Sequence, residues 1–253
     1  MKNFQAGKLT VKIFSSRKSM GEAAAAEAAV KIRKMLSEKK EINIIFGAAP
    51  SQNEFLAALA EDATIEWGRI NAFHMDEYIG LSPDAPQGFG NFLKDRIFGK
   101  VDFKSINYLN GIVKDTEQEC ERYAGLLKAY PTDIVCMGIG ENGHIAFNDP
   151  HVAFFKDTKL VKVVELDKKC RNQQVNDGCF KSLEQVPTHA LTLTIPVLTA
   201  GKFIYCMVPA ATKAEAVFNT VTGDVTEACP ASILKTHGHA ILYTDINSAS
   251  KIF

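Results

Sequence analysis

Residues 138–150 combine three glycines with a histidine, two amides and two carboxylates, a mixture that suits proton-transfer chemistry. They follow an apolar run at residues 134–137 that is typical of a buried strand. Glycine allows a sharp turn or a close approach of the backbone to a ligand. His144 and Asp149 are residue types that exchange protons near neutral pH. The segment therefore predicts an acid–base site where a strand ends.

The glycines also form a G-x-G-x-x-G pattern at Gly138, Gly140 and Gly143, which in dinucleotide-binding proteins opens a long helix. Here the pattern runs toward Pro150, which resists helix formation. No crossover helix is expected before Asp167, so dinucleotide binding is disfavoured. A glycine-rich turn with a solvated histidine is the simplest alternative without a function.

Composition narrows the class of protein. Apolar residues make up 46% of the chain and charged residues 23%, as in ordinary globular proteins. Lys plus Arg and Asp plus Glu both number 29, which argues against nucleic-acid binding through bulk positive charge. No apolar run is long enough to cross a membrane, and no signal peptide opens the chain. The six cysteines form no Cys-x-x-Cys pair, so we expect reduced thiols and a cytoplasmic protein.

Strand-like and helix-like segments alternate along the chain. This spacing predicts a single α/β domain over residues 1–253, Rossmann-like, with a mainly parallel sheet and helices on both faces. In such sheets, ligands bind at the carboxyl ends of the strands. Ser19, with Glu22 three residues on, is the predicted cap of the first helix. We expect strands at 9–14, 42–46, 70–74, 134–138, 160–166, 190–195, 203–208 and 240–243, and helices at 19–40, 51–62, 88–98, 116–130 and 212–220.

Residues 138–150 resemble the signature of the glucosamine-6-phosphate deaminase/isomerase family, to which galactosamine-6-phosphate isomerase and 6-phosphogluconolactonase are related. Residues 73–81, 107–111 and 185–192 resemble further segments of that family, in the same order. The resemblance covers nearly the whole chain.

The resemblance implies that an amino-sugar 6-phosphate opens from its ring, moves a proton between C2 and C1, and loses ammonia. It assigns the carbon-to-carbon proton shuttle to Asp76 and ring opening to His144. Asp149 matches the acidic partner of that histidine, and Asn142 matches a further ring-opening position. A carboxylate on the second ring nitrogen fixes the tautomer of a histidine and raises its basicity.

Substrate binding is predicted first at the turn formed by Gly47, Ala48, Ala49 and Ser51, between a strand and a helix. Backbone N–H groups at a helix start bind phosphate, and the Ser51 hydroxyl is the expected side-chain donor. The family usually has a Thr-Gly-Gly-Thr-Pro turn here, so this chain departs from it.

Four further residues complete the predicted binding set: Glu77, Gly138, Arg171 and Lys213. Lys213 matches a family lysine at a helix start. Arg171 lies where the family has a phosphate-binding arginine, in different surroundings. Each cation has a plain alternative as a solvated surface charge, since charged side chains are mostly exposed.

Neither a metal nor an organic cofactor is expected. His74 with Asp76, and His237 with His239, lack the three or four convergent ligands of a transition-metal site. His74 is better explained as a packed strand residue. Composition alone would favour Asp76 as a solvated turn acid, whereas the resemblance of residues 73–81 favours the shuttle.

Three rival functions share this pattern. A galactosamine-6-phosphate isomerase would use the same machinery, whereas a 6-phosphogluconolactonase would not need Asp76 as a shuttle. A sugar-phosphate sensor would carry a DNA-binding module, for which a first strand near Leu9 leaves no room. The chain stops at Phe253, soon after its last strand, so we expect no elaborate allosteric site. The expected partner is a small sugar phosphate, with no nucleic acid or membrane and a possible homo-oligomer.

Overall fold

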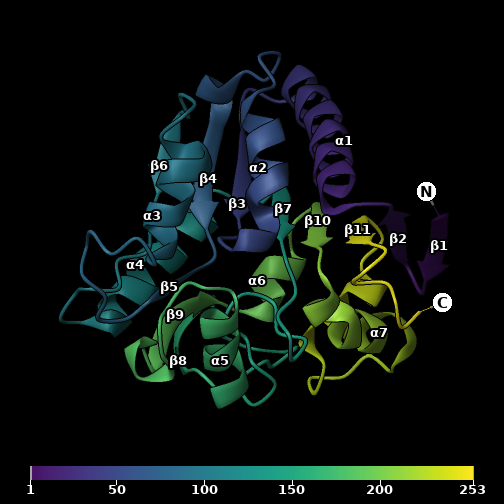
Figure 1. Ribbon diagram of the computed structural model, residues 1–253. Coiled ribbons are helices and arrows are strands. Elements are labelled where there is room, and N and C mark those ends of the chain that lie inside the picture. The colour runs from purple at the N-terminus through teal and green to yellow at the C-terminus, as the bar shows by residue number, and fades with distance from the viewer. Residues whose placement is uncertain (1, 253) are drawn as a thin grey trace.

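Short β-branched and aromatic runs form an eight-stranded sheet at the centre of the molecule (Figure 1). The computed structural model describes residues 2–252. Every neighbouring pair is parallel except β1 with β2, so the predicted fold class is confirmed. In spatial order the strands are β1 (Lys2–Ala6), β2 (Leu9–Phe14), β11 (Ala240–Asp245), β10 (Phe203–Val208), β7 (Ile134–Met137), β3 (Ile42–Phe46), β4 (Ile70–His74) and β6 (Ser105–Asn107).

Helices cover both faces of this sheet because its central strands are apolar on both sides. Ile44 and Phe46 of β3 pack with α1, α2 and α3, whereas Ile45 packs with α4, α6 and α7. No helix among residues 2–252 is long and apolar enough to cross a membrane. The helices are α1 (Arg17–Glu38), α2 (Asn53–Ala60), α3 (Phe89–Leu93), α4 (Thr116–Ala129), α5 (Lys168–Asn176), α6 (Ile195–Thr199) and α7 (Ala214–Thr222).

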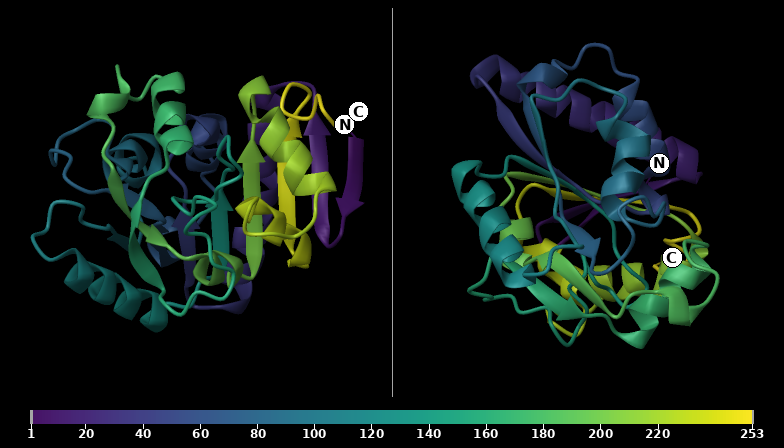
Figure 2. Two further views of the ribbon diagram at one scale, coloured as in Figure 1. Left: turned by 90° about the horizontal axis from the view of Figure 1, so that it is seen from below. Right: turned by 90° about the vertical axis from the view of Figure 1, so that its left-hand side faces the viewer.

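A second, antiparallel sheet was not foreseen. It has the order β5 (Asp76–Tyr78), β9 (His189–Leu193) and β8 (Val161–Glu165). Figure 2 shows both ends of the chain at the β1 edge, on the other side of the molecule from β8 and β9. Asp76 was expected in a turn, but it begins β5 and pairs with Thr192. The strand is only three residues long, too short for any alternation to reveal it.

Several predicted boundaries were wrong for local reasons. The cap of α1 is Ser16, whose extended backbone lets its hydroxyl accept the N–H of Ser19, so the Ser19–Glu22 capping box does not form. Ser51 lies in a short 3-10 turn before α2 and makes no cap bond. The helix expected at 88–98 is α3 followed by a π-helical turn, Lys94–Phe98.

The packing of α1 on α2 tests this arrangement. A Cβ added at Gly21 would lie 2.6 Å from Glu54 Cβ, whereas one added at Gly125 in α4 would meet nothing within 4 Å. We expect Gly125→Ala to raise the free energy of unfolding by about 0.5–1 kcal/mol, because alanine is the better helix former. Gly21→Ala should instead lower it by about 1–3 kcal/mol through overpacking. Urea unfolding of both variants checks this, and equal effects would contradict the helix packing.

Candidate functional site

A cavity of about 410 Å³ opens at the carboxyl ends of β3, β4, β7 and β10. This is the edge at which parallel α/β sheets bind ligands. A Cβ at Gly138 would lie 3.1 Å from both Ser51 Oγ and Gln52 Nε2, so the turn after β3 and the end of β7 approach closely. Predicted site residues on the cavity wall are Gly47, Ala48, Ala49, Ser51, Asp76, Gly138, His144 and Lys213.

His144 presents its ring to this cavity from the glycine-rich loop. Its Nδ1 lies 2.8 Å from Asn142 Oδ1 and 3.1 Å from Asp149 Oδ1. Both neighbours are acceptors, so Nδ1 carries the proton and Nε2 keeps its lone pair. A Cβ at Gly140 would lie 2.1 Å from His144 Cε1, so the loop passes directly over the ring.

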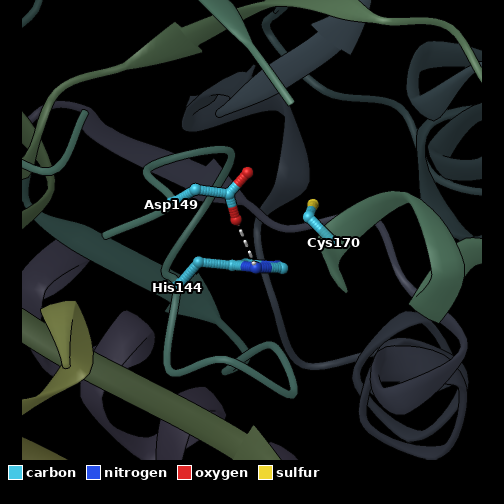
Figure 3. Close-up of side chains that lie close together, drawn as sticks. All are labelled: His144, Asp149 and Cys170. Carbon is cyan, nitrogen blue, oxygen red and sulfur yellow. Dashed lines mark ion pairs between the residues drawn. The ribbon is translucent and has the colours of Figure 1, made fainter. Parts of the chain in front are cut away.

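Asp149 is fully buried, and its carboxylate points at the His144 ring (Figure 3). Burial opposes its charge, yet hydrogen bonds from His144, Asn142 and the Asp167 backbone hold the pKa of Asp149 below its usual value. An ionised carboxylate on the inner nitrogen stabilises the imidazolium that forms when Nε2 takes a proton. The pair can therefore act as a general base and then return the proton.

Cys170 also lies in this cluster, and its sulfur is within 4.8 Å of ligand atoms of His144 and Asp149. Burial and the neighbouring carboxylates raise the pKa of the Cys170 thiol well above its usual range. The thiol therefore stays protonated, and a metal ligand would have to be a thiolate. In this protonated form the thiol belongs to the same hydrogen-bonding cluster as His144 and Asp149.

Asp76 faces the same cavity from the start of β5 and is 5% exposed. Burial, helped by the neighbouring Glu77 carboxylate, raises its pKa well above the usual value. A carboxylate with a raised pKa is a stronger base, suited to taking a proton from carbon and returning it.

Lys213 supplies positive charge at the start of α7. Its side chain is 6% exposed, and no carboxylate of residues 2–252 lies within ion-pair distance of it. Burial lowers the pKa of Lys213, an effect that Asp177 and Glu141 oppose. A buried ammonium facing a cavity requires an anionic partner, which a ligand phosphate would provide.

Sequence reasoning missed Arg17, the second cation on the cavity wall. Its Nε donates to Glu54 Oε1 over 2.6 Å, and its guanidinium also bonds the carbonyl of Pro50 in the turn after β3. The usable signal was its place directly after β2, because the carboxyl ends of parallel strands share one edge of the sheet. The buried amides Gln52 and Gln174 also line the cavity and were not predicted.

Two predicted binding residues lie away from the cavity. The Glu77 carboxylate accepts N–H bonds from Tyr78, Phe89 and Gly90, so it holds the start of α3 and borders a different groove. Arg171 donates to the carbonyls of Leu183 and Val186 on another face. Asn142 and Asp149 lie behind His144 and do not line the cavity.

The geometry defines an α/β protein with an acid–base site at the carboxyl edge of its sheet, and comparison with known proteins identifies the family. Residues 15–242 match the family described as glucosamine-6-phosphate isomerases/6-phosphogluconolactonase, and the chain belongs to it. A glucosamine-6-phosphate deaminase from Bacillus thuringiensis (strain Al Hakam) is 33% identical over 225 residues, which is 89% of this chain and 84% of that one.

Solved structures agree with this family. A monomeric glucosamine-6-phosphate deaminase has a TM-score of 0.85 at 30% identity, over 95% of this chain and 98% of the other. A 6-phosphogluconolactonase from Trypanosoma brucei, at 14% identity and with full coverage of both chains (100%), has a TM-score of 0.81 and shares the fold.

The contact between Gly140 and His144 is testable. We expect Gly140→Ala to displace the His144 ring, because the added methyl group would overlap it, and to cost about 1–3 kcal/mol of stability. NMR signals of the His144 ring nitrogens should shift. Gly238→Ala is the matched control, since a Cβ there meets nothing within 4 Å. An unchanged His144 spectrum in Gly140→Ala would contradict the described loop.

Proposed function

We propose that this protein converts glucosamine 6-phosphate to fructose 6-phosphate and ammonia. One observation carries the proposal: Asp76 and His144 face the same cavity, and the buried, unpaired Lys213 lies on its wall. Two proton-transfer groups and an anion-binding cation are what this reaction requires of a site. The relatives named above as glucosamine-6-phosphate deaminases support the same activity.

The first step opens the sugar ring. His144 Nε2 takes the proton of the C1 hydroxyl and delivers it to the ring oxygen. Asp149 stabilises the imidazolium between these events, and Asn142 holds the ring in place through Nδ1.

The second step moves a proton between two carbons. Asp76 removes the proton from C2 of the open chain, and the C2 ammonium group passes a proton to the C1 oxygen, which gives an enolamine. Asp76 then returns its proton to C1, which gives an iminium at C2. Water adds to C2, the C–N bond breaks with release of ammonia, and the ketose phosphate remains. Burial suits Asp76 to this role because water cannot easily exchange the transferred proton.

The phosphate is placed between Lys213, Arg17 and the turn that holds Ala48 and Ser51. Lys213 provides the charge, while the Ser51 hydroxyl and the backbone N–H groups of the turn provide hydrogen bonds. Arg171 and Glu77 have no part in binding under this proposal, because neither lines the cavity.

The direct test incubates the purified protein with glucosamine 6-phosphate and measures ammonia and fructose 6-phosphate. Galactosamine 6-phosphate, in a parallel assay, tests selectivity at C4, and 6-phosphogluconolactone tests the lactonase alternative. If the protein turns over neither glucosamine 6-phosphate nor galactosamine 6-phosphate, the proposal is rejected. Under the same proposal the protein acts in the cytoplasm without metal or cofactor, and sizing of the purified protein would settle whether it is a homo-oligomer.

Asp76→Asn should lower kcat by about 10²–10⁴-fold, because an amide cannot carry the proton between carbons. KM should change little, since Asp76 contacts the reacting carbons and not the phosphate. Steady-state kinetics checks both values. A variant with full activity would show that another group is the shuttle.

His144→Gln should slow ring opening more than later steps. We expect a loss of about 10²–10⁴-fold in kcat with the cyclic substrate. The loss should be smaller with an analogue locked in the open chain. Equal losses with both forms would contradict a ring-opening role for His144.

A further inference from the structure

Asp167 connects the catalytic loop to helix α5 through three hydrogen bonds. Its Oδ1 accepts the N–H of Cys170 over 2.6 Å, which caps the helix. Its Oδ2 accepts from Asn142 Nδ2 over 2.9 Å, and its backbone N–H donates to Asp149 Oδ2 over 3.0 Å. One side chain thus bonds both a helix start and a member of the site.

These contacts determine which way round the Asn142 amide lies. Asn142 Nδ2 donates to two carboxylates, Asp149 Oδ1 over 2.8 Å and Asp167 Oδ2 over 2.9 Å. The reversed amide would place its oxygen against both anions, which is strongly unfavourable. The observed orientation leaves Asn142 Oδ1 to accept from His144, both from its backbone N–H over 3.0 Å and from Nδ1.

We propose that Asp167 is a positioning residue that fixes the Asn142 amide and, through it, the tautomer of His144 that leaves Nε2 free toward the cavity. Without the Asp167 carboxylate, one N–H of Asn142 would lose its acceptor. The reversed amide would then face only the Asp149 carboxylate, so it would be less unfavourable. The catalytic consequence rests on the proposed function, whereas the tautomer can be measured without any turnover.

The variant Asp167→Asn separates this role from helix capping. Asparagine caps helices as well as aspartate does, so the bond to Cys170 can remain. Its amide nitrogen, however, would face Asn142 Nδ2, and two donors cannot bond each other. The matched control is Asp115→Asn, because Asp115 caps α4 by accepting the N–H of Gln118 over 3.0 Å.

We expect Asp167→Asn to change the ¹⁵N signals of the His144 ring toward a mixture of tautomers, while Asp115→Asn leaves them unchanged. Turnover of glucosamine 6-phosphate should fall about 10–100-fold in kcat, the size of loss seen when a residue that orients a metal-ligating histidine is removed. KM should stay within about threefold, and Asp167→Asn should unfold at a somewhat lower temperature than the control because one N–H of Asn142 loses its acceptor. Should Asp167→Asn fail to fold, Asp167→Ser keeps a cap and removes the acceptor.

A double variant gives the sharpest test. The two oxygens of an aspartate at position 142 are equivalent, so that side chain has no orientation for Asp167 to fix. In an Asn142→Asp background, Asp167→Asn should cause no further loss of turnover. It should also relieve repulsion among the carboxylates of the cluster. A purely structural role of Asp167 would not produce this coupling between the two positions. A wild-type His144 spectrum in Asp167→Asn, or equal losses in both backgrounds, would overturn the proposal. If the wild-type enzyme lacks deaminase activity but the His144 signals respond as described, the proposed function fails and this inference stands.

Discussion

The ionised Asp149 carboxylate is the interaction on which the site depends. A buried charge is tolerated only when it is paired and hydrogen-bonded. Asp149 meets this requirement with Asn142, His144 and the Asp167 backbone, which come from the glycine-rich loop and from the segment before α5. This one carboxylate therefore joins the glycine-rich loop to the segment before α5 and gives His144 Nδ1 one of its two acceptors, the other being Asn142 Oδ1.

Residues of the candidate site come from both sheets. The carboxyl edge of the parallel sheet brings together His144, the turn after β3 and the start of α7 with Lys213. Asp76 lies two residues beyond the end of β4 and is held in place by the small antiparallel sheet, through pairing of β5 with β9. The proposed proton-transfer groups Asp76 and His144 therefore meet in one cavity at the carboxyl edge of the parallel sheet.

The sequence was informative wherever a signal was local. Apolar runs such as Ile42–Phe46 and Phe203–Val208 predicted strands with their observed bounds, because a parallel strand is buried on both faces. The pairing of His144 with Asp149 was implied by the family resemblance, and their close spacing in one loop is compatible with it. Arg17 follows a predicted strand and so had a local signal too, but its contacts with Glu54 and Pro50 depend on long-range packing of α1 against α2.

The same distinction explains the errors. Glu77 adjoins Asp76 in sequence, but successive strand residues point to opposite sides of a sheet. The Glu77 carboxylate therefore accepts N–H bonds at the start of α3 and does not face the cavity. Arg171 and Gln174 lie within one turn of the same helix, yet only Gln174 faces the cavity. A helix face cannot be assigned until the helix itself is recognised, and α5 was not.

The central claim is that one buried carboxylate carries a proton from C2 to C1 of the substrate. Glucosamine 6-phosphate deuterated at C2 tests this claim under single-turnover conditions, with the label followed into fructose 6-phosphate by mass spectrometry and NMR. The account predicts that a measurable share of the deuterium is retained at C1. Turnover in which C1 of fructose 6-phosphate carries no deuterium even at the shortest times would contradict it.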